Sequence, residues 1–314
     1  MSTSFVRYSS GPRAAARWGL LEDGSVHPLG EDVRSTADVL ADAATTAGAA
    51  RSARPVPIDE VRLLAPTPDA RILCQGANYR SHMIESGMDP DRAFNMIFTK
   101  STASLSGPHD DVVRPAHVRL LDYEVELGLV LRSSITGPTE VTGATLADHV
   151  GGFVVANDVS ARDVQLPQGQ WYKGKSYRTF CPVGPYLVVP DPDEVARWSQ
   201  LRLRLTVNGE VRQDSLAGDM VFGPAATLTE LSQLEDLAPG DLILTGTPGG
   251  VALQPPPAPV QRIAGLLPEA RRWQLFVTGQ ARSDAYLKPG DVVEASIRTD
   301  DGTLDLGTQR TTVR

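Results

Sequence analysis

Two acidic segments contain the side chains best suited to chemistry. The first, DYEVELGLVL at residues 122–131, carries three carboxylates at alternate positions. Because successive side chains of an extended strand point to opposite sides, Asp122, Glu124 and Glu126 are expected to stand on one face. Like charges at this spacing repel one another unless water, basic side chains or a bound cation neutralises them. The row therefore needs water, basic side chains or a bound cation beside it.

The second acidic segment, VVANDVSARDVQLPQ, begins as an apolar strand and ends at Asn157-Asp158. A carboxylate at the end of a strand can point into a pocket. Glu124, Glu126 and Asp158 would then supply three oxygen ligands from two strands, a set that suits Mg²⁺ or Mn²⁺. Zinc is not favoured, because the set contains no histidine or thiolate. The alternative interpretation is that the two glutamates are solvated or salt-bridged residues of a strand face.

Basic and amide side chains follow Asp158 closely: Arg162 and Gln165 in SARDVQ, then Lys173 and Lys175 in WYKGKSYRTF. An arginine fork suits a carboxylate, and a lysine ammonium can stabilise an enolate or an oxyanion. Together these residues indicate an anionic substrate. In the alternative interpretation, Arg162 pairs with Asp158 or Asp163 and the lysines are exposed, and exposure is more expected of Lys173 than of Lys175.

Two further motifs are candidates for the same site. GANYRSHMIES places His82 and Glu85 three residues apart, so they share one face of a helical turn and could act as an acid–base pair on a water molecule. The HxxE spacing is, however, common by chance. LAPGDLILTGTPGG is typical of a strand entering a glycine-rich turn, where Thr245, Thr247 and backbone amides could hold anionic oxygens. It lacks the GxxxxGK[ST] pattern, which argues against nucleotide binding.

Strands are expected to position most of these residues. From about residue 72 onward, apolar runs such as RILCQG, HVRLLDYEVELGLVL, GGFVVANDVS, DLILTGT and DVVEASI predict strands. No regular βαβ alternation appears, which argues against a doubly wound sheet. In LRLRLTVNGEVRQ, Asn208-Gly209 predicts a two-residue hairpin turn of type I′. The predicted fold class is therefore mainly β with minor α.

The chain is expected to divide near residue 65. Residues 1–65 predict a small N-terminal α+β domain, with a hairpin turning at Glu22-Asp23-Gly24 and an Ala-rich helix from about Val39 to Ala50. Residues 66–314 form the second predicted domain, which contains every candidate site residue. Within it, a Pro-rich insertion at about 252–285 is predicted to be a surface excursion or an oligomer contact, with a short helix or strand in RIAGLLPEARRWQLF.

Length and composition are those of an ordinary soluble globular protein. The chain has 314 residues, of which 41% are hydrophobic and 22% charged, and a formal net charge of −8. The acidic excess argues against a nucleic-acid partner. Without an apolar leader or eighteen consecutive apolar residues, the sequence predicts a cytoplasmic protein with no membrane partner. Cys74 and Cys181 lie in apolar surroundings without zinc or redox spacing, so we expect buried free thiols.

Eight sequence blocks occur in the order found in one family: GANYRSH, LDYEVELGLVL, GGFVVANDVSARDVQ, GKSYRTFCPVGP, VNGEVRQ, DMVF, LAPGDLILTGTPGGV and LKPGDVVE. On these blocks, residues 66–314 resemble the fumarylacetoacetate hydrolase family. The resemblance implies a mixed β-sandwich roll, with a smaller N-terminal domain in front, that is usually a homodimer. It also implies that Glu124, Glu126 and Asp158 hold Mg²⁺ or Mn²⁺, and that Asp122 stands beside these ligands, its repulsion offset by the cation.

The resemblance implies roles for the remaining candidates as well. His82 and Glu85 match a mobile HxxE segment that orders over bound substrate and activates water. Lys175 matches a lysine near the scissile carbon. The groups around the substrate carboxylate and keto oxygen are matched by Arg162, Gln165 and Thr247.

Two features depart from the family pattern. Where many members read KSFD, this chain reads KSYR, so Arg178 replaces an acid close to the predicted pocket. That arginine either favours a more anionic substrate or forms a surface pair. The Pro-rich segment after GTPGGV is longer than the connection usual in the family, and either narrows the entrance or extends the dimer interface.

A small anionic 2-oxo acid is the substrate that this site predicts. In a 2,4-diketo acid such as an acylpyruvate, the carboxylate and the 2-oxo oxygen would chelate a cation that stabilises the charge developing as the C3–C4 bond breaks. Hydrolysis of that bond by water activated at His82 is therefore the first prediction. Decarboxylation of an oxaloacetate-like acid, or keto–enol or double-bond isomerisation of a 2-oxo dicarboxylic acid, stays open as the alternative. A catalytically silent binding scaffold is the third hypothesis, and the retained ligands argue against it.

Overall fold

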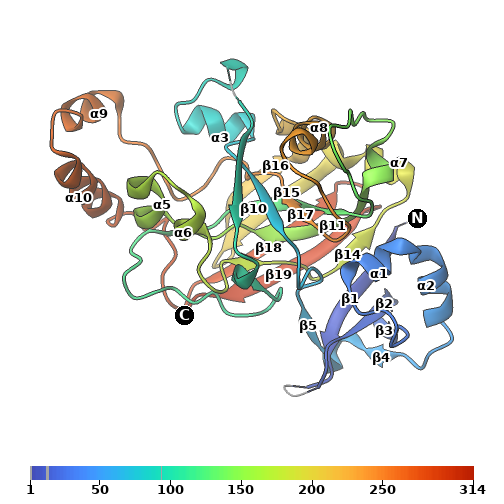
Figure 1. Ribbon diagram of the computed structural model, residues 1–314. Helices are drawn as coiled ribbons and strands as arrows, with labels where there is room; N and C mark the ends of the chain where they lie inside the picture. The colour runs from blue at the N-terminus through green and yellow to red at the C-terminus, as the bar shows by residue number, and fades with distance from the viewer. Residues whose placement is uncertain (1, 12–13, 93) are drawn as a thin grey trace.

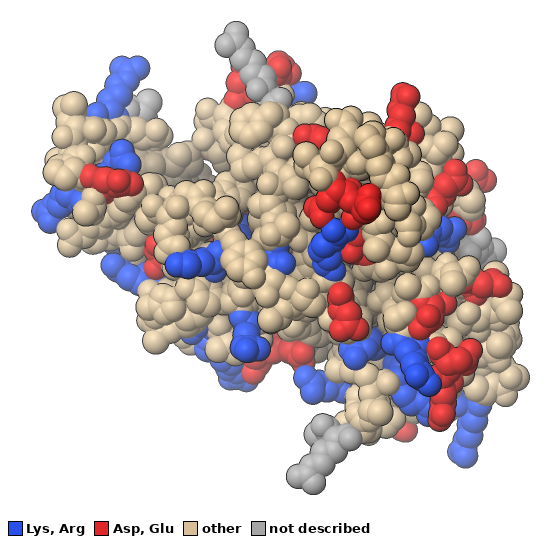
Figure 2. All heavy atoms as spheres, in the orientation of Figure 1, with Lys and Arg blue, Asp and Glu red and all other residues tan. Residues whose placement is uncertain are grey.

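The computed structural model of the protein describes residues 2–11, 14–92 and 94–314. Strands dominate this part of the chain, as predicted, and form one large mixed sheet, one four-stranded antiparallel sheet and two short strand pairs. The N-terminal strands lie at one side of the molecule and the C-terminal insertion helices at the opposite side (Figure 1). Basic and acidic side chains of the described residues intermingle across the face in Figure 2.

The large sheet contains eleven of the described strands, in the order β4-β3-β2-β1-β14-β11-β10-β17-β6-β7, with β5 also paired to β1. These strands are β1 (Thr3–Ser9), β2 (Arg17–Glu22), β3 (Ser25–Pro28), β4 (Val56–Pro57), β5 (Arg62–Leu64), β6 (Ile72–Gly76), β7 (Met96–Lys100), β10 (Val125–Leu131), β11 (Val150–Asn157), β14 (Leu187–Val189) and β17 (Leu242–Leu244). The β6 and β17 strands pair in parallel. Every residue of β10 and β11 is buried, as expected for central strands covered on both faces.

The four-stranded sheet has the order β16-β15-β18-β19. Its strands are β15 (Leu201–Val207), β16 (Glu210–Leu216), β18 (Val292–Thr299) and β19 (Asp305–Thr312). The predicted hairpin at Asn208-Gly209 is confirmed, because these residues join β15 to β16 with φ angles of 53° and 82°, the positive values that a type I′ turn requires. Alternate side chains of β15, β18 and β10 enter one hydrophobic core, and this core joins the two sheets.

The N-terminal residues extend the large sheet, because β1 pairs with β14. The predicted hairpin is confirmed by the β2–β3 pairing around Asp23 and Gly24. The single helix predicted from Val39 to Ala50 is wrong, since two helices occur, α1 (Thr36–Ala41) and α2 (Ala43–Ala50). Asp42 separates them because its side chain accepts a hydrogen bond from the Thr45 N–H and so caps α2.

The long strand predicted across HVRLLDYEVELGLVL is also divided. Its first part, β9 (Leu121–Asp122), pairs with β12 (Ser160–Ala161), whereas β10 pairs with β11. The Asn157 side chain accepts a hydrogen bond from the Glu124 N–H at 2.9 Å, in place of a ladder partner. Asp122 therefore belongs to a different strand pair from Glu126. The other short pair is β8 (Leu105–Ser106) with β13 (Cys181–Pro182).

Short helices connect and cover these sheets. The remaining α-helices are α3 (Arg80–Glu85), α4 (Leu146–His149), α5 (Arg162–Gln168), α6 (Tyr172–Lys175), α7 (Pro192–Ala196), α8 (Pro224–Leu234), α9 (Ala258–Ala264) and α10 (Glu269–Gln280). Single 3₁₀ turns occur at Ile58–Glu60, Pro90–Arg92, Thr102–Ser104, Trp198–Gln200 and Ala217–Asp219. No helix in the described chain has the length and apolar character needed to cross a membrane.

The predicted insertion at 252–285 contains α9 and α10. Partly buried Phe276 and Val277 of α10 pack against the main core. Several apolar side chains of the insertion are exposed, among them Ile263 and Leu266. The segment is therefore helical and attached to the core through one face of α10.

Candidate active site

Three carboxylates from two adjoining strand ends meet inside the protein. One oxygen atom each of Glu124, Glu126 and Asp158 lies within 4.8 Å of the other two. The pairing of Val125 with Asn157 brings the start of β10 beside the end of β11 and thereby assembles the group. The three residues are 5%, 1% and 0% exposed. Their burial excludes the alternative in which the two glutamates are solvated, whereas the salt bridges expected in that alternative do occur at Glu124.

Two buried lysines neutralise part of this charge. Lys175, at the end of α6, places its Nζ 3.0 Å from Glu124 Oε2 and forms an ion pair with Asp158. Lys100, at the end of β7, forms an ion pair with the other oxygen of Asp158 and donates a hydrogen bond to the Phe180 carbonyl at 2.9 Å. The sequence analysis missed Lys100. The one indication in the sequence that Lys100 is buried is its position at the end of the apolar run MIFTK.

A buried arginine is the third cation of the cluster. Arg162 donates from Nε to Asp122 Oδ2 at 2.8 Å, donates from Nη1 to Gln165 Oε1 at 2.9 Å and forms an ion pair with Glu124. Among the described residues its partners thus do not include Asp158 or Asp163, the aspartates near it in the sequence. Asp122 also accepts hydrogen bonds from the backbone N–H groups of Ala252 and Leu253, at 2.8 and 3.1 Å. The start of the insertion is therefore tied to the cluster.

The electrostatic environment distinguishes the carboxylates. Burial opposes ionisation of Glu124, but Arg162 and Lys175 outweigh it and lower the pKa of Glu124 to about 2. Burial, followed by the charges of Asp158 and Glu124, raises the pKa of Glu126 well above its usual range. Burial disfavours the ammonium of Lys175, yet Asp158 and Glu124 raise its pKa overall.

Glu126 is the carboxylate that needs a further cation. Among the described residues its side chain has one hydrogen-bond donor, the Gly246 N–H at 2.8 Å, and no ion pair with a lysine or arginine. The buried donor set is entirely oxygen, which is the preference of Mg²⁺ and Mn²⁺. Glu124, Glu126 and Asp158 thus fit a hard divalent cation, whose charge would stabilise ionised Glu126.

The HxxE pair lies on α3, next to this cluster. Burial is the largest influence on the imidazole of His82 and lowers its pKa; the charge of Glu124 opposes this shift and that of Arg162 adds to it. The carboxylate of Glu85 accepts a hydrogen bond from the Gly250 N–H at 2.9 Å. In the described chain no hydrogen bond joins His82 to Glu85. The histidine is therefore within electrostatic reach of the cluster, and the glutamate is bound to the glycine-rich turn.

The glycine-rich turn is held by side chains that act inside the fold. The Thr247 hydroxyl donates to the Val125 carbonyl at 3.0 Å and accepts from Gln213 Nε2 at 2.8 Å. The Thr245 hydroxyl donates to the Leu127 carbonyl at 2.9 Å. Gln213, which the sequence analysis missed, also accepts from the Val125 N–H at 3.0 Å. It links β16 to the start of β10, the strand that carries Glu126 and directly follows Glu124.

The remaining residues named in the sequence analysis are Lys173, Arg178, Cys74 and Cys181. Lys173 and Arg178 are exposed, whereas Lys175 is buried, as the sequence indicated. Arg178 has no ion pair in the described part of the chain. Cys74 and Cys181 are buried free thiols, as predicted, and burial raises the pKa of both.

Two family models match this chain. Residues 71–314 match the model described as fumarylacetoacetate (FAA) hydrolase C-terminal, and residues 4–66 match one described as Rv2993c-like, N-terminal. The chain belongs to the fumarylacetoacetate hydrolase family. The family expected from the eight sequence blocks is thereby confirmed, and similar solved structures confirm the expected fold. The N-terminal match ends at residue 66 and the C-terminal match begins at residue 71, and the domain division near residue 65 stays a prediction.

Relatives in this family include different enzymes. The 2,4-didehydro-3-deoxy-L-rhamnonate hydrolase of Sphingomonas sp. (strain SKA58) is 36% identical over 310 residues, which cover 98% of this chain and 94% of that protein. The mitochondrial oxaloacetate tautomerase FAHD2A of Bos taurus is 41% identical over 204 residues, which cover 63% of this chain and 62% of the tautomerase. A crystal structure of a probable 2-hydroxyhepta-2,4-diene-1,7-dioate isomerase from Mycobacterium abscessus matches with a TM-score of 0.73 and 31% identity, covering 100% of this chain and 98% of that one.

Proposed function

We propose that this protein is a divalent-metal-dependent hydrolase that cleaves a C–C bond of an acylpyruvate-like 2,4-diketo acid. The observation that carries the proposal is the buried group of Glu124, Glu126 and Asp158, with Lys175 paired to two of them. Mg²⁺ or Mn²⁺ held by these three carboxylates would supply a Lewis acid for the oxygens of a 2-oxo acid. The remaining tasks fall to the side chains around them.

His82 is proposed as the base that takes a proton from the attacking water. Because burial lowers its pKa, the imidazole is neutral near pH 7 and can accept a proton. Glu85 contributes indirectly, since its hydrogen bond to Gly250 holds the end of α3 on the glycine-rich turn. The pair thus divides into a base and a positioning residue.

Lys175 and Arg162 are proposed to provide the positive charge that an anionic substrate requires. Lys175 stays charged because Asp158 and Glu124 raise its pKa, so it can stabilise negative charge developing on the leaving enolate. Arg162 is oriented by Asp122 and Gln165 and retains N–H donors for a substrate carboxylate. We assign Gln165 to the same carboxylate subsite.

The substrate class is supported by the relative that matches almost the whole chain. The named substrate of the Sphingomonas hydrolase is oxidised at positions 2 and 4 and lacks the 3-hydroxyl group, which is the 2,4-diketo pattern. A hydroxylated 2,4-diketo acid is therefore an appropriate second member of a substrate screen, after acetylpyruvate.

A second candidate function is tautomerisation or decarboxylation of an oxaloacetate-like acid. It is favoured by the 41% identity to the bovine oxaloacetate tautomerase and by the neutral imidazole of His82, which could relocate a proton without activating water. Both reactions would use the same three carboxylates. Products, rather than metal dependence, separate the two functions.

Turnover of acetylpyruvate and oxaloacetate, with Mg²⁺, with Mn²⁺ and with EDTA, tests these functions. Acetate with pyruvate supports hydrolysis, carbon dioxide supports decarboxylation, and a faster loss of enol absorbance without either supports tautomerisation. Glu126→Gln is expected to lower metal affinity and turnover together, while Glu140→Gln, which removes an exposed carboxylate, changes neither. Full activity in EDTA would refute the metal-dependent proposal.

His82→Ala separates binding from hydrolysis. The variant is expected to bind Mg²⁺ with unchanged affinity in calorimetry and to lose most hydrolysis of acetylpyruvate. Undiminished hydrolysis would remove His82 from the mechanism. Lys175→Met is expected to reduce kcat, and normal turnover by its folded fraction would remove the role assigned to Lys175.

The homodimer implied by the family resemblance stays a prediction. Light scattering at micromolar concentration is expected to give twice the 33.6 kDa mass of the chain. A mass of one chain would contradict it.

A further inference from the structure

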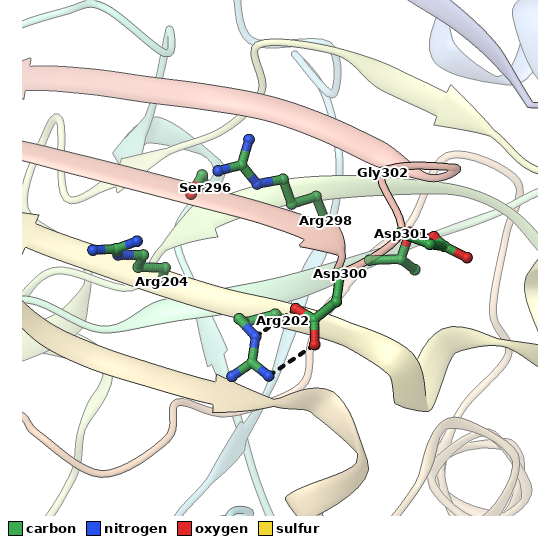
Figure 3. A pocket seen from close by; sticks show the side chains of 8 residues that line it. Arg202, Arg204, Ser296, Arg298, Asp300, Asp301 and Gly302 are labelled. Atoms are coloured by element: carbon green, nitrogen blue, oxygen red, sulfur yellow. Dashed lines mark hydrogen bonds and ion pairs between the residues drawn. The ribbon is translucent and has the colours of Figure 1, made fainter.

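A hollow of about 430 Å³ lies on the outer face of the four-stranded sheet. Strands β15 and β18 and the turn that follows β18 line it, and it shares no lining residue with the candidate active site. Figure 3 shows Arg204 and Arg298 on the same side of these strands, with Ser296 between them. We call Arg204, Ser296 and Arg298 the outer arginine site.

Strand alternation places basic residues on this face. Inward side chains such as Leu203 and Ile297 are fully buried, so their neighbours point outward. Arg204 lies opposite Ser296 in the β15–β18 pairing and diagonal to Arg298. Diagonal positions on paired strands are roughly 7–8 Å apart, a separation that two arginine side chains can bridge. The two guanidinium groups can therefore reach one ligand.

A second like-charge contact occurs on the same face, since Arg202 lies directly opposite Arg298. Like charges at directly opposed positions destabilise a strand pair unless anions compensate them. Arg202 has such anions: it binds Asp300 through two hydrogen bonds of 2.7 and 2.9 Å, and Asp214 through one of 3.0 Å. Its charge is satisfied within the protein.

The nearby carboxylates of the described chain form no ion pair with Arg204 or Arg298 and bind other groups instead. Asp301 pairs with Arg197 at 2.7 Å. Asp305, the cross-strand neighbour of Arg298, accepts a hydrogen bond from the Gly307 N–H at 2.8 Å. Across the described residues, neither Arg204 nor Arg298 has an ion pair or a side-chain hydrogen bond. Asp214 lies opposite Arg204 in the β15–β16 pairing, but its ion pair is with Arg202. In a protein of net charge −8, two adjacent guanidinium groups that form no ion pair with the described residues, beside a hollow, are a local exception.

We propose that the outer arginine site binds a phosphoryl group, either as inorganic phosphate or as part of a small phosphorylated metabolite. A tetrahedral dianion can accept hydrogen bonds from two planar guanidinium groups, and the Ser296 hydroxyl is a further donor between them. The hollow is within the size range of small-molecule sites, so it has room for an organic part as well as the phosphoryl group.

Calorimetric titration of the wild-type protein with inorganic phosphate and with glycerol phosphate tests the proposal. Sodium chloride at equal ionic strength serves as the blank, because screening alone acts on every exposed charge. The variant R204Q/R298Q is expected to weaken phosphoryl binding at least tenfold. The control R262Q/R271Q removes the same charge from exposed positions of the insertion helices and is expected to bind as the wild type does.

Two further readouts keep the result attributable to this face. S296A is expected to weaken binding less than the double arginine variant, because it removes one neutral donor. Turnover of acetylpyruvate by R204Q/R298Q is expected to be unchanged, which separates the outer arginine site from the active site. Tighter binding of glycerol phosphate than of phosphate would identify a phosphorylated metabolite as the ligand, and equal binding would identify free phosphate. The proposal is overturned if neither compound binds above the chloride blank, or if R204Q/R298Q binds as well as the control variant.

Discussion

Replacing Lys100 by methionine tests whether the buried carboxylates depend on a cation that sequence patterns do not reveal. The Lys100 side chain is fully buried, its ammonium is paired with Asp158, and it donates to the Phe180 carbonyl at 2.9 Å. Methionine has nearly the same length and apolar stem but no charge. Asp158 would then keep one lysine partner, Lys175, which also pairs with Glu124.

The expected cost follows from the charges in the cluster. Four buried carboxylates face three cations; the carboxylates are Asp122, Glu124, Glu126 and Asp158, and the cations are Lys100, Arg162 and Lys175. Burial and the neighbouring carboxylates raise the pKa of Glu126, which favours its protonated form; with that proton in place, the three other carboxylates balance the three cations. Removing one partner of a buried ion pair costs about 3–5 kcal/mol, and the retained Lys175 points to the lower end. The Phe180 carbonyl loses its donor at about 1 kcal/mol more, for a total near 4 kcal/mol.

Guanidinium denaturation at pH 7 in EDTA measures this cost. Lys288→Met is the matched control, because Lys288 forms an exposed ion pair with Asp284 and its loss is expected to change the free energy of unfolding by less than ~1 kcal/mol. Excess Mg²⁺ is expected to recover part of the loss in Lys100→Met, since it restores positive charge to the carboxylates. If Lys100→Met does not fold, the double variant with Asp158→Asn is expected to be more stable than the single one, because both charges are then absent. An unfolding free energy within 1 kcal/mol of wild type would refute the argument.

Three other residues give separate predictions. Asp122→Asn leaves Arg162 without one anionic partner and presents an amide to the N–H groups of residues 252 and 253. We expect a loss of about 3 kcal/mol in the free energy of unfolding and faster hydrogen exchange at residues 252–253. Unchanged exchange would contradict the proposed attachment of the insertion to Asp122. The pKa of Glu126 in the folded protein exceeds its unfolded value of about 4.3, so the folded metal-free protein binds one more proton than the unfolded chain between these two pKa values. The free energy of unfolding is therefore expected to fall as pH rises above about 4.3, by at most about 1.4 kcal/mol per pH unit. Denaturation series run in EDTA measure this slope. Glu126→Gln should remove that slope, and an identical slope in the variant would count against the assignment. The lowered pKa of His82 places the acid limb of the kcat/KM profile below pH ~6.5, and a limb above that value would exclude His82 as the base.

Much of the fold could be predicted from local patterns. Both hairpin turns follow from their own residues, since Asp23-Gly24 and Asn208-Gly209 tolerate the positive φ angles that these turns need. The break between α1 and α2 was missed, although Asp42 is its cause. An aspartate in an Ala-rich run can cap a helix or point into solvent, and the run alone does not determine which conformation is more stable.

The candidate ligands could be predicted because their chemistry is visible in the sequence. Glu124 and Glu126 are spaced by strand periodicity, and Asp158 follows an apolar run that predicts a central strand. The single strand expected through Asp122 was wrong, because the chain leaves one strand pair and enters another at residues 123–124. Strand exchange of this kind depends on which partners are available in three dimensions.

The sequence by itself determined the turn positions, the mainly β character and the oxygen-rich set of candidate ligands, because each depends on local residue types and spacing. Only the tertiary structure decided how the carboxylate charge is balanced. Lys100 contacts Asp158 across 58 residues and Gln213 contacts Val125 across 88, and such contacts leave no periodic signal in the chain. A buried charge is stable only beside its partner, and that partner can come from any segment that the fold brings within a few ångströms.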